Sequence, residues 1–154
     1  MEIHYKTKIA KAQDIYKHLM ECKENFHPPL DTSVNIQEYA KKLFNNSVTF
    51  EAWDKLRLVG LVATYFNDTK NHLGFISNVS VSTTYSGKRI ASTLMNNCIN
   101  YAAKHHIKEI NLEVNKNSTN AIHLYEKFNF KKTGNKENFV IMRHKPLYPI
   151  HKTD

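Results

Sequence analysis

Hydrophobic and polar positions along the chain follow two different periods, and their alternation predicts a mixed order of elements. Residues 3–9 alternate apolar and polar side chains with a period of two, which is typical of a strand. From about residue 11 the period lengthens, and Ile15, Leu19 and Cys22 recur on one helical face. Strand patterns are also present at 47–53, 56–66, 72–81, 108–114 and 139–142, and helical patterns at 36–43, 90–102 and 118–128. The predicted order is β-α-α-β-β-β-α-β-α-β-β, in which the strand before 139–142 is given no residue range.

This order predicts a single mixed α/β (α+β) domain in which helices flank one largely antiparallel sheet. The 154 residues suit one domain rather than two, and no linker or repeat divides them. Asp54 and Lys55 make a short polar break between two strand patterns, which predicts a hairpin. Pro146 and Pro149 follow the last strand pattern closely. We therefore expect the domain to occupy residues 1–145 and a C-terminal tail to occupy residues 146–154.

Charge narrows the expected partners without choosing among them. The chain has 22 Lys and Arg residues against 14 Asp and Glu residues, a formal net charge of +8. This surplus favours an anionic partner, which could be nucleic acid, a membrane surface or a phosphorylated small molecule. No stretch approaches the ~18 to 20 consecutive apolar residues of a membrane span, and the charged, alternating N-terminus is unlike a signal peptide. Cys22 and Cys98 form no CxxC motif and are expected to be free buried thiols of a cytoplasmic protein.

The most informative local pattern is the polar turn between the strand at 72–81 and the long helix that follows. A helix start presents unpaired backbone N–H groups and the positive end of the helix dipole, so it can hold a phosphate. Gly87 allows close backbone approach, and Lys88 and Arg89 add positive charge. Basic residues near a helix start are common, so this turn alone supports only a weak prediction of a phosphate site.

Two motifs together resemble the GNAT superfamily of N-acetyltransferases. Residues 79–92 (VSVSTTYSGKRIAS) resemble its acetyl-CoA signature, a strand, a short turn and then [Arg/Gln]-x-x-Gly-x-[Gly/Ala] at the start of a helix. Residues 118–130 (STNAIHLYEKFNF) resemble its second signature, Asn-x-x-Ala-x-x-Leu-Tyr-Glu-Lys-x-Gly-Phe. Both occur in the family's order, separated by a helix and a strand.

The resemblance implies a GNAT-like fold, acetyl-CoA as co-substrate and transfer of its acetyl group to a primary amine in a ternary complex. It implies that Tyr125 protonates the departing CoA thiolate and that backbone N–H groups near residues 79–81 stabilise the oxyanion. The residues expected to bind the cofactor are Val79, Ser80, Val81, Ser86, Gly87, Lys88, Arg89, Ile90, Ala91, Ser92 and Ser118.

The chain departs from the signatures at three positions. Ser86 replaces the usual Arg or Gln, Arg89 the usual Gly, and Ser118 the usual Asn. The Cβ of Arg89 intrudes where backbone normally approaches the pyrophosphate, whereas its guanidinium offers a charge-assisted phosphate contact. The sequence leaves both outcomes open.

The sequence does not identify the general base that would remove a proton from the amine. Candidate carboxylates are Glu51, Asp54 and Glu113, and no pattern favours one of them. The histidines lack the spacing of a metal site, so no metal is expected; His27 belongs to the loop between the first two helices, which borders the acceptor site in the family.

Two further functions stay open beside acetyl transfer to a small-molecule or peptide amine. One is a catalytically degenerate GNAT-like domain that binds CoA, and the other is a basic nucleic-acid-binding domain. The latter is disfavoured because the lysines are dispersed and no motif that reads DNA or RNA is present. No membrane partner is expected, and the sequence leaves a homodimer possible.

Overall fold

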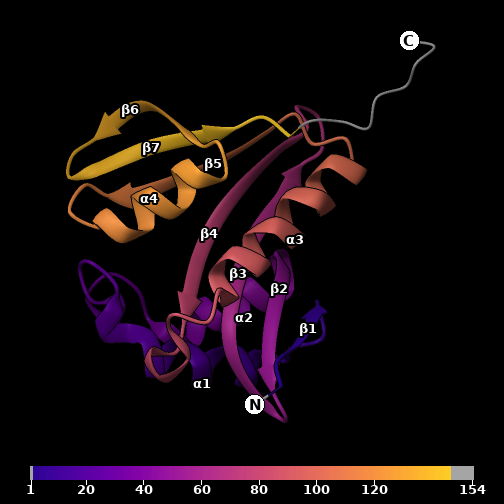
Figure 1. Ribbon diagram of the computed structural model, residues 1–154, viewed down its shortest axis with the longest axis vertical. Helices are drawn as coiled ribbons and strands as arrows, with labels where there is room; N and C mark the ends of the chain where they lie inside the picture. The colour runs from indigo at the N-terminus through magenta and orange to yellow at the C-terminus, as the bar shows by residue number, and fades with distance from the viewer. Residues whose placement is uncertain (1, 147–154) are drawn as a thin grey trace.

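The computed structural model describes residues 2–146 and contains the predicted order of elements (Figure 1). The strands are β1 (His4–Thr7), β2 (Val48–Asp54), β3 (Arg57–Asp68), β4 (Leu73–Val81), β5 (Glu109–Asn115), β6 (Lys131–Lys136) and β7 (Phe139–His144). The α-helices are α1 (Ala12–Cys22), α2 (Ile36–Asn46), α3 (Ile90–Lys104) and α4 (Thr119–Lys127). Three short 3-10 helices, η1 (Lys23–Asn25), η2 (Leu30–Thr32) and η3 (Thr83–Tyr85), lie in the connections.

The strands form one 7-stranded sheet in the order β1-β2-β3-β4-β5-β7-β6. Every neighbouring pair is antiparallel except β4 and β5, which are parallel because helix α3 connects them. The predicted fold class, a mixed and mostly antiparallel sheet flanked by helices, is confirmed.

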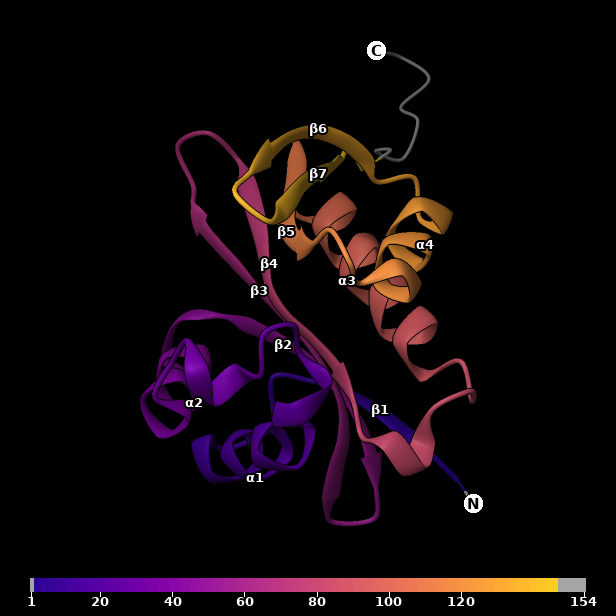
Figure 2. The same ribbon diagram turned by 90° about the vertical axis from the view of Figure 1, so that its left-hand side faces the viewer.

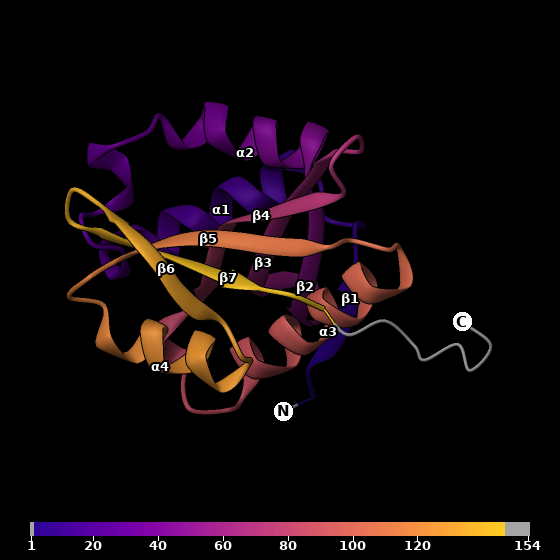
Figure 3. The same ribbon diagram turned by 90° about the horizontal axis from the view of Figure 1, so that it is seen from above.

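Helices cover both faces of the sheet, and each covers the face to which its apolar stripe belongs. Figure 2 shows α1 and α2 on one side of the strands and α3 and α4 on the other. On α1, Ile15 and Leu19 are fully buried in a cluster with Leu61 of β3. On α3, Leu94 and Cys98 are fully buried in the cluster on the opposite face. Seen from above, the molecule is therefore a three-layer structure of helices, sheet and helices (Figure 3).

Strands β4 and β5 pair only at their first residues and then diverge. Leu73, Gly74 and Phe75 pair with residues 109–111, and no pairing with β5 extends beyond Phe75. The remainder of β4 continues toward α1 while β5 turns away with β7 (Figure 1). The backbone edge of β4 after Phe75 thus faces an opening between the two halves of the sheet.

An irregularity in β4 lies at this opening. Ala63 of β3 pairs with Asn78 and the next residue, Thr64, pairs with Ile76, so Ser77 is an extra residue in β4. Such a bulge redirects side chains and leaves one residue outside the ladder. It is placed where β4 separates from β5.

Within the described residues, one local feature differs from its prediction and another agrees with it. Leu56 was expected to begin a strand but lies in the hairpin turn and is 94% exposed, because β3 begins at Arg57. Cys22 and Cys98 are free and buried, as predicted. Residues 147–154, most of the predicted tail, lie outside the described residues, so the boundary at residue 145 stays a prediction. Within residues 2–146, no helix is long and apolar enough to span a membrane.

Candidate active site

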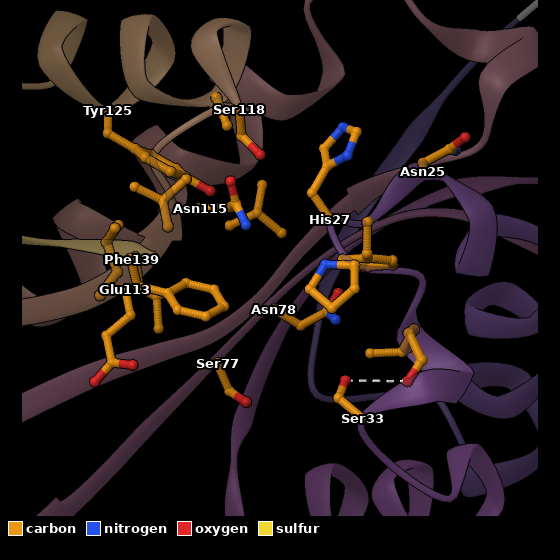
Figure 4. A pocket seen from close by; sticks show the side chains of 18 residues that line it. Asn25, His27, Ser33, Ser77, Asn78, Glu113, Asn115, Ser118, Tyr125 and Phe139 are labelled. Atoms are coloured by element: carbon orange, nitrogen blue, oxygen red, sulfur yellow. Dashed lines mark hydrogen bonds between the residues drawn. The ribbon is translucent and has the colours of Figure 1, made fainter. Parts of the chain in front are cut away.

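A cavity of about 410 Å³ fills the opening between β4 and β5. Its walls come from the α1–α2 connection, from β4 and β5, from α4 and from Phe139 of β7 (Figure 4). The bulge residue Ser77 lines it together with Asn78 and Val79. The divergence of the two strands therefore creates the space.

Tyr125 lies in the wall of this cavity. It is 7% exposed, and its ring packs against Phe130 with 5.9 Å between ring centroids. Figure 4 shows the side chain extending from α4 into the cavity beside Asn115 and Ser118. Burial raises the pKa of the Tyr125 hydroxyl, so the group keeps its proton at neutral pH. A protonated hydroxyl in this place is suited to donate a proton.

A second cavity, of about 290 Å³, lies at the start of α3. Val81, Tyr85 and residues of the turn and first helical turn line it: Ser86, Gly87, Arg89, Ile90, Ala91 and Ser92. Arg89 is the N-cap residue and makes no side-chain capping bond, and the first bond of the helix runs from the N–H of Thr93 to the carbonyl of Arg89. The N–H groups of the first turn are therefore free of intrahelical partners, as in an anion site.

The turn before α3 has two residues in the left-handed region. Gly87 has φ +78° and Arg89 has φ +61°. The second is the position where the family signature has glycine, and left-handed backbone costs a residue with a Cβ about 1–2 kcal/mol. Arg89 thus has a backbone conformation that glycine accepts more readily, and its exposed side chain lines the second cavity.

Strand β4 connects the two cavities. Val79 lines the first cavity and Val81 lines the second. Residues two apart on a strand are about 6.6 Å apart and point to the same face. A long, thin molecule lying along the free edge of β4 would therefore reach from the start of α3 to Tyr125.

The predicted site residues divide between these cavities. Val79, Ser118 and Tyr125 line the first, whereas Val81, Ser86, Gly87, Arg89, Ile90, Ala91 and Ser92 line the second. Lys88 and Ser80 line neither. The Ser80 hydroxyl donates to Asn78 Oδ1 at 2.8 Å and lies 2.9 Å from Nε2 of His18 on α1.

A tyrosine and a histidine connect β4 to the helices behind it. The Tyr39 hydroxyl of α2 contacts the bulge residue Ser77, at 3.1 Å from its carbonyl oxygen and 2.6 Å from its Oγ. Burial lowers the pKa of His18 to about 4, so the ring is neutral at pH 7. It packs between α1 and β4 as an uncharged group hydrogen-bonded to Ser80. These contacts hold the wall of the first cavity against α1 and α2, and no sequence pattern marked them.

Two of the considered carboxylates are committed to structural contacts. Glu51 is fully buried, and its carboxylate accepts bonds from the N–H groups of Ile9 and Ala10 and from the side chains of Thr49 and Trp53. Asp54 accepts a bond from the hydroxyl of Tyr85, which fastens the β2–β3 hairpin to the turn before α3. Neither residue lines the first cavity, so both are poorly placed as general base.

The third carboxylate, Glu113, does line the first cavity, and so does His27. Glu113 lies 3.8 Å from the ammonium of Lys136 on β6. His27 also borders an adjoining cavity of about 380 Å³ lined by polar residues of the β5–α4 connection. Within residues 2–146, no cluster of three or more His, Cys, Asp or Glu side chains is arranged to hold a metal ion.

Solved structures share this fold over nearly all of their length. A protein from Pyrococcus horikoshii OT3 superposes with a TM-score of 0.75 at 24% identity, covering 94% of this chain and 98% of that one. PaiA N-acetyltransferase from Thermoplasma acidophilum, solved in complex with coenzyme A, gives a TM-score of 0.75 at 17% identity with 94% and 99% coverage. The ribosomal-protein-S18-alanine N-acetyltransferase from Escherichia coli gives 0.75 at 15% identity with 98% and 97% coverage. Curated protein sequences offer no match to this chain.

The sheet is mixed, its two parallel strands β4 and β5 diverge after Phe75, and helix α3 begins just after β4 ends. The sequence model of the acetyltransferase (GNAT) family matches residues 12–130. The chain belongs to the GNAT acetyltransferase family, and the resemblance inferred from the two motifs is confirmed.

Proposed function

We propose that this protein transfers the acetyl group of acetyl-CoA to a primary amine by direct attack in a ternary complex. The observation that carries the proposal is the pair of cavities along β4, one at the start of α3 and one beside Tyr125. In this proposal the pyrophosphate binds the N–H groups of residues 87–92, and the pantetheine arm follows the free edge of β4 past Val81 and Val79. The thioester then lies beside Tyr125. The coenzyme A bound to the Thermoplasma acidophilum neighbour supports this choice of co-substrate.

The reaction needs a proton donor for the thiolate and hydrogen-bond donors for the oxyanion, and in this proposal groups at the first cavity supply both. The unprotonated amine attacks the thioester carbon, which forms the N–C bond and places negative charge on the carbonyl oxygen. Backbone N–H groups at the unpaired part of β4 would stabilise that charge. When the C–S bond breaks, the Tyr125 hydroxyl would protonate the thiolate, and the nitrogen's surplus proton restores the tyrosine.

Direct attack is favoured over an acyl-enzyme because no cysteine is among the described residues that line the first cavity. Burial also raises the pKa of the Cys22 thiol to about 11 and that of the Cys98 thiol to about 12. Both side chains therefore stay protonated and buried at neutral pH, whereas a thiolate is the reactive form.

The proposal is tested by two measurements on the intact chain. Calorimetry should show binding of acetyl-CoA and weaker binding of duplex DNA at the same salt concentration, since a basic nucleic-acid-binding domain would show the reverse. Release of free thiol from acetyl-CoA should then depend on an added amine in a panel of peptides, amino sugars, polyamines and antibiotics. Binding of acetyl-CoA without thiol release for any amine would indicate a degenerate CoA-binding domain.

Substitution of Gly87 by Val tests the phosphate site. A Cβ at Gly87 meets nothing within 4 Å, but φ +78° is unfavourable for a β-branched residue, so the turn should change its backbone rather than its packing. We expect the dissociation constant of acetyl-CoA to rise roughly tenfold while thermal unfolding stays cooperative. Gly134→Val, in strand β6 and distant from the turn, is the matched control. An unchanged affinity for Gly87→Val would place the phosphates elsewhere.

Replacement of Arg89 by Gly distinguishes a phosphate contact from an obstruction. Glycine accepts the left-handed backbone of this position, so the turn should be retained and only the side chain lost. If the guanidinium contacts a phosphate, the dissociation constant of acetyl-CoA should rise roughly two- to tenfold and depend less on salt. Tighter binding after the substitution would instead identify Arg89 as an obstruction and favour the degenerate domain.

A further inference from the structure

The described residues that line the first cavity carry almost no charge. Glu113 is the single carboxylate among them, and neither lysine nor arginine is present. The polar groups are mostly amides and hydroxyls, contributed by Asn25, Ser33, Ser77, Asn78, Asn115 and Ser118. Such groups recognise uncharged polar parts of a ligand, whereas a cation with several ammonium groups requires carboxylates.

The single carboxylate has a cation beside it. Glu113 Oε2 lies 3.8 Å from Nζ of Lys136, and Figure 4 shows the carboxylate at the opposite end of the cavity from His27 and Asn25. The chain as a whole has a formal net charge of +8, which repels polycations at long range. Neither local nor long-range electrostatics therefore favours a polycationic acceptor.

The same cavity is poor in groups that could remove a proton from a strongly basic amine. Its titratable lining residues, from the α1–α2 connection, β5 and α4, are His27, Glu113 and Tyr125. Tyr125 keeps its proton, and Glu113 is paired with Lys136. At pH 7.5 roughly a third of a peptide α-amine is unprotonated, against roughly one part in a thousand of a lysine amine. An amine of low basicity thus needs the least help from this cavity.

We infer that the acceptor is a weakly basic amine on an uncharged polar body, such as the α-amine of a peptide or an amino sugar, and not a polyamine. The uncharged amide and hydroxyl lining of the cavity and the Glu113–Lys136 pair carry this inference. It deepens the proposed function and rests on it.

Four amines test the inference directly: alanylserine amide, glucosamine, Nα-acetyl-lysine amide and spermidine, each assayed for thiol release at pH 7.5. We expect kcat/KM for alanylserine amide or glucosamine to exceed the other two by at least tenfold, and the better of the two identifies the source of the amine. Equal or faster turnover of spermidine or of the lysine amide would overturn the inference. Absence of thiol release with every amine of the wider panel would instead contradict the proposed function itself.

A variant that removes the ammonium group beside Glu113 provides a second test. Lys136→Met should raise kcat/KM for spermidine about two- to fivefold, the effect of one exposed ion pair, and leave alanylserine amide within twofold. Lys132→Met removes the same charge from the same exposed strand and is the control. An equal rise in both variants, or no rise in either, would show that the pair does not control the choice of acceptor.

Discussion

Tyr125→Phe should lower kcat by at least tenfold while the affinity for acetyl-CoA changes little. The substitution removes the hydroxyl that extends into the first cavity and keeps the ring that packs against Phe130. Positioned proton donors typically contribute about 10²- to 10⁴-fold to rate. Because the pKa of Tyr125 is raised by burial, the wild-type hydroxyl is available as a donor throughout the neutral range.

The measurement compares single-amine turnover and acetyl-CoA binding for the wild type and the variant. The control is Tyr101→Phe, which also removes one tyrosine hydroxyl. Tyr101 lies on α3, packs against Phe50 and Phe66, and lines neither cavity, so its loss should leave turnover unchanged. Turnover at the wild-type rate by Tyr125→Phe would show that the tyrosine only packs. The proton for the thiolate would then come from water or from the acceptor ammonium.

Glu51→Gln should destabilise the fold by about 3 kcal/mol, because a neutral amide cannot accept all the bonds that the carboxylate accepts. Four donors converge on this fully buried group, from Ile9, Ala10, Thr49 and Trp53. The amide NH2 would face donors and leave some of them unsatisfied. For a chain of this size the loss corresponds to a fall in Tm of roughly 6–12 °C.

Thermal and denaturant unfolding of the two forms measure this effect. Glu38→Gln removes a carboxylate from the exposed side of α2 and should change stability by no more than about 0.5 kcal/mol. If Glu51→Gln lowers the free energy of unfolding no more than Glu38→Gln does, the hydrogen bonds of the Glu51 carboxylate do not stabilise the fold. Glu51 would then again be a candidate general base.

The first cavity, the proposed acceptor site, is formed by features that sequence patterns do not encode. The family resemblance indicated that the α1–α2 loop with His27 borders the acceptor site, but no pattern marked the other residues of this connection that line the first cavity. Ser77 and Asn78 belong to an ordinary strand pattern, and the bulge that turns them toward the cavity arises from the register between β3 and β4. Glu113 and Lys136 become partners only because β5, β7 and β6 are neighbours in the sheet.

Sequence alone determined the order of elements, the fold class and the family, because these depend on local periods and on two motifs in a fixed order. The alternation in β5 and the helical stripe of α3 are local properties, and each predicts its element without knowledge of the partners. The left-handed backbone of Arg89 was not predicted, because the signature marked this position only as one that usually has glycine.

Tertiary structure decided what each candidate residue does. Glu51, Asp54 and Glu113 all belong to strand or hairpin patterns in the sequence. In the fold, Glu51 accepts hydrogen bonds from four donors and Asp54 accepts one from Tyr85, whereas Glu113 lines the first cavity. The cavity itself exists because β4 stops pairing with β5 after Phe75. A carboxylate's role is set by which donors, cations and open space come within a few ångströms of it, and residues distant in sequence supply all three.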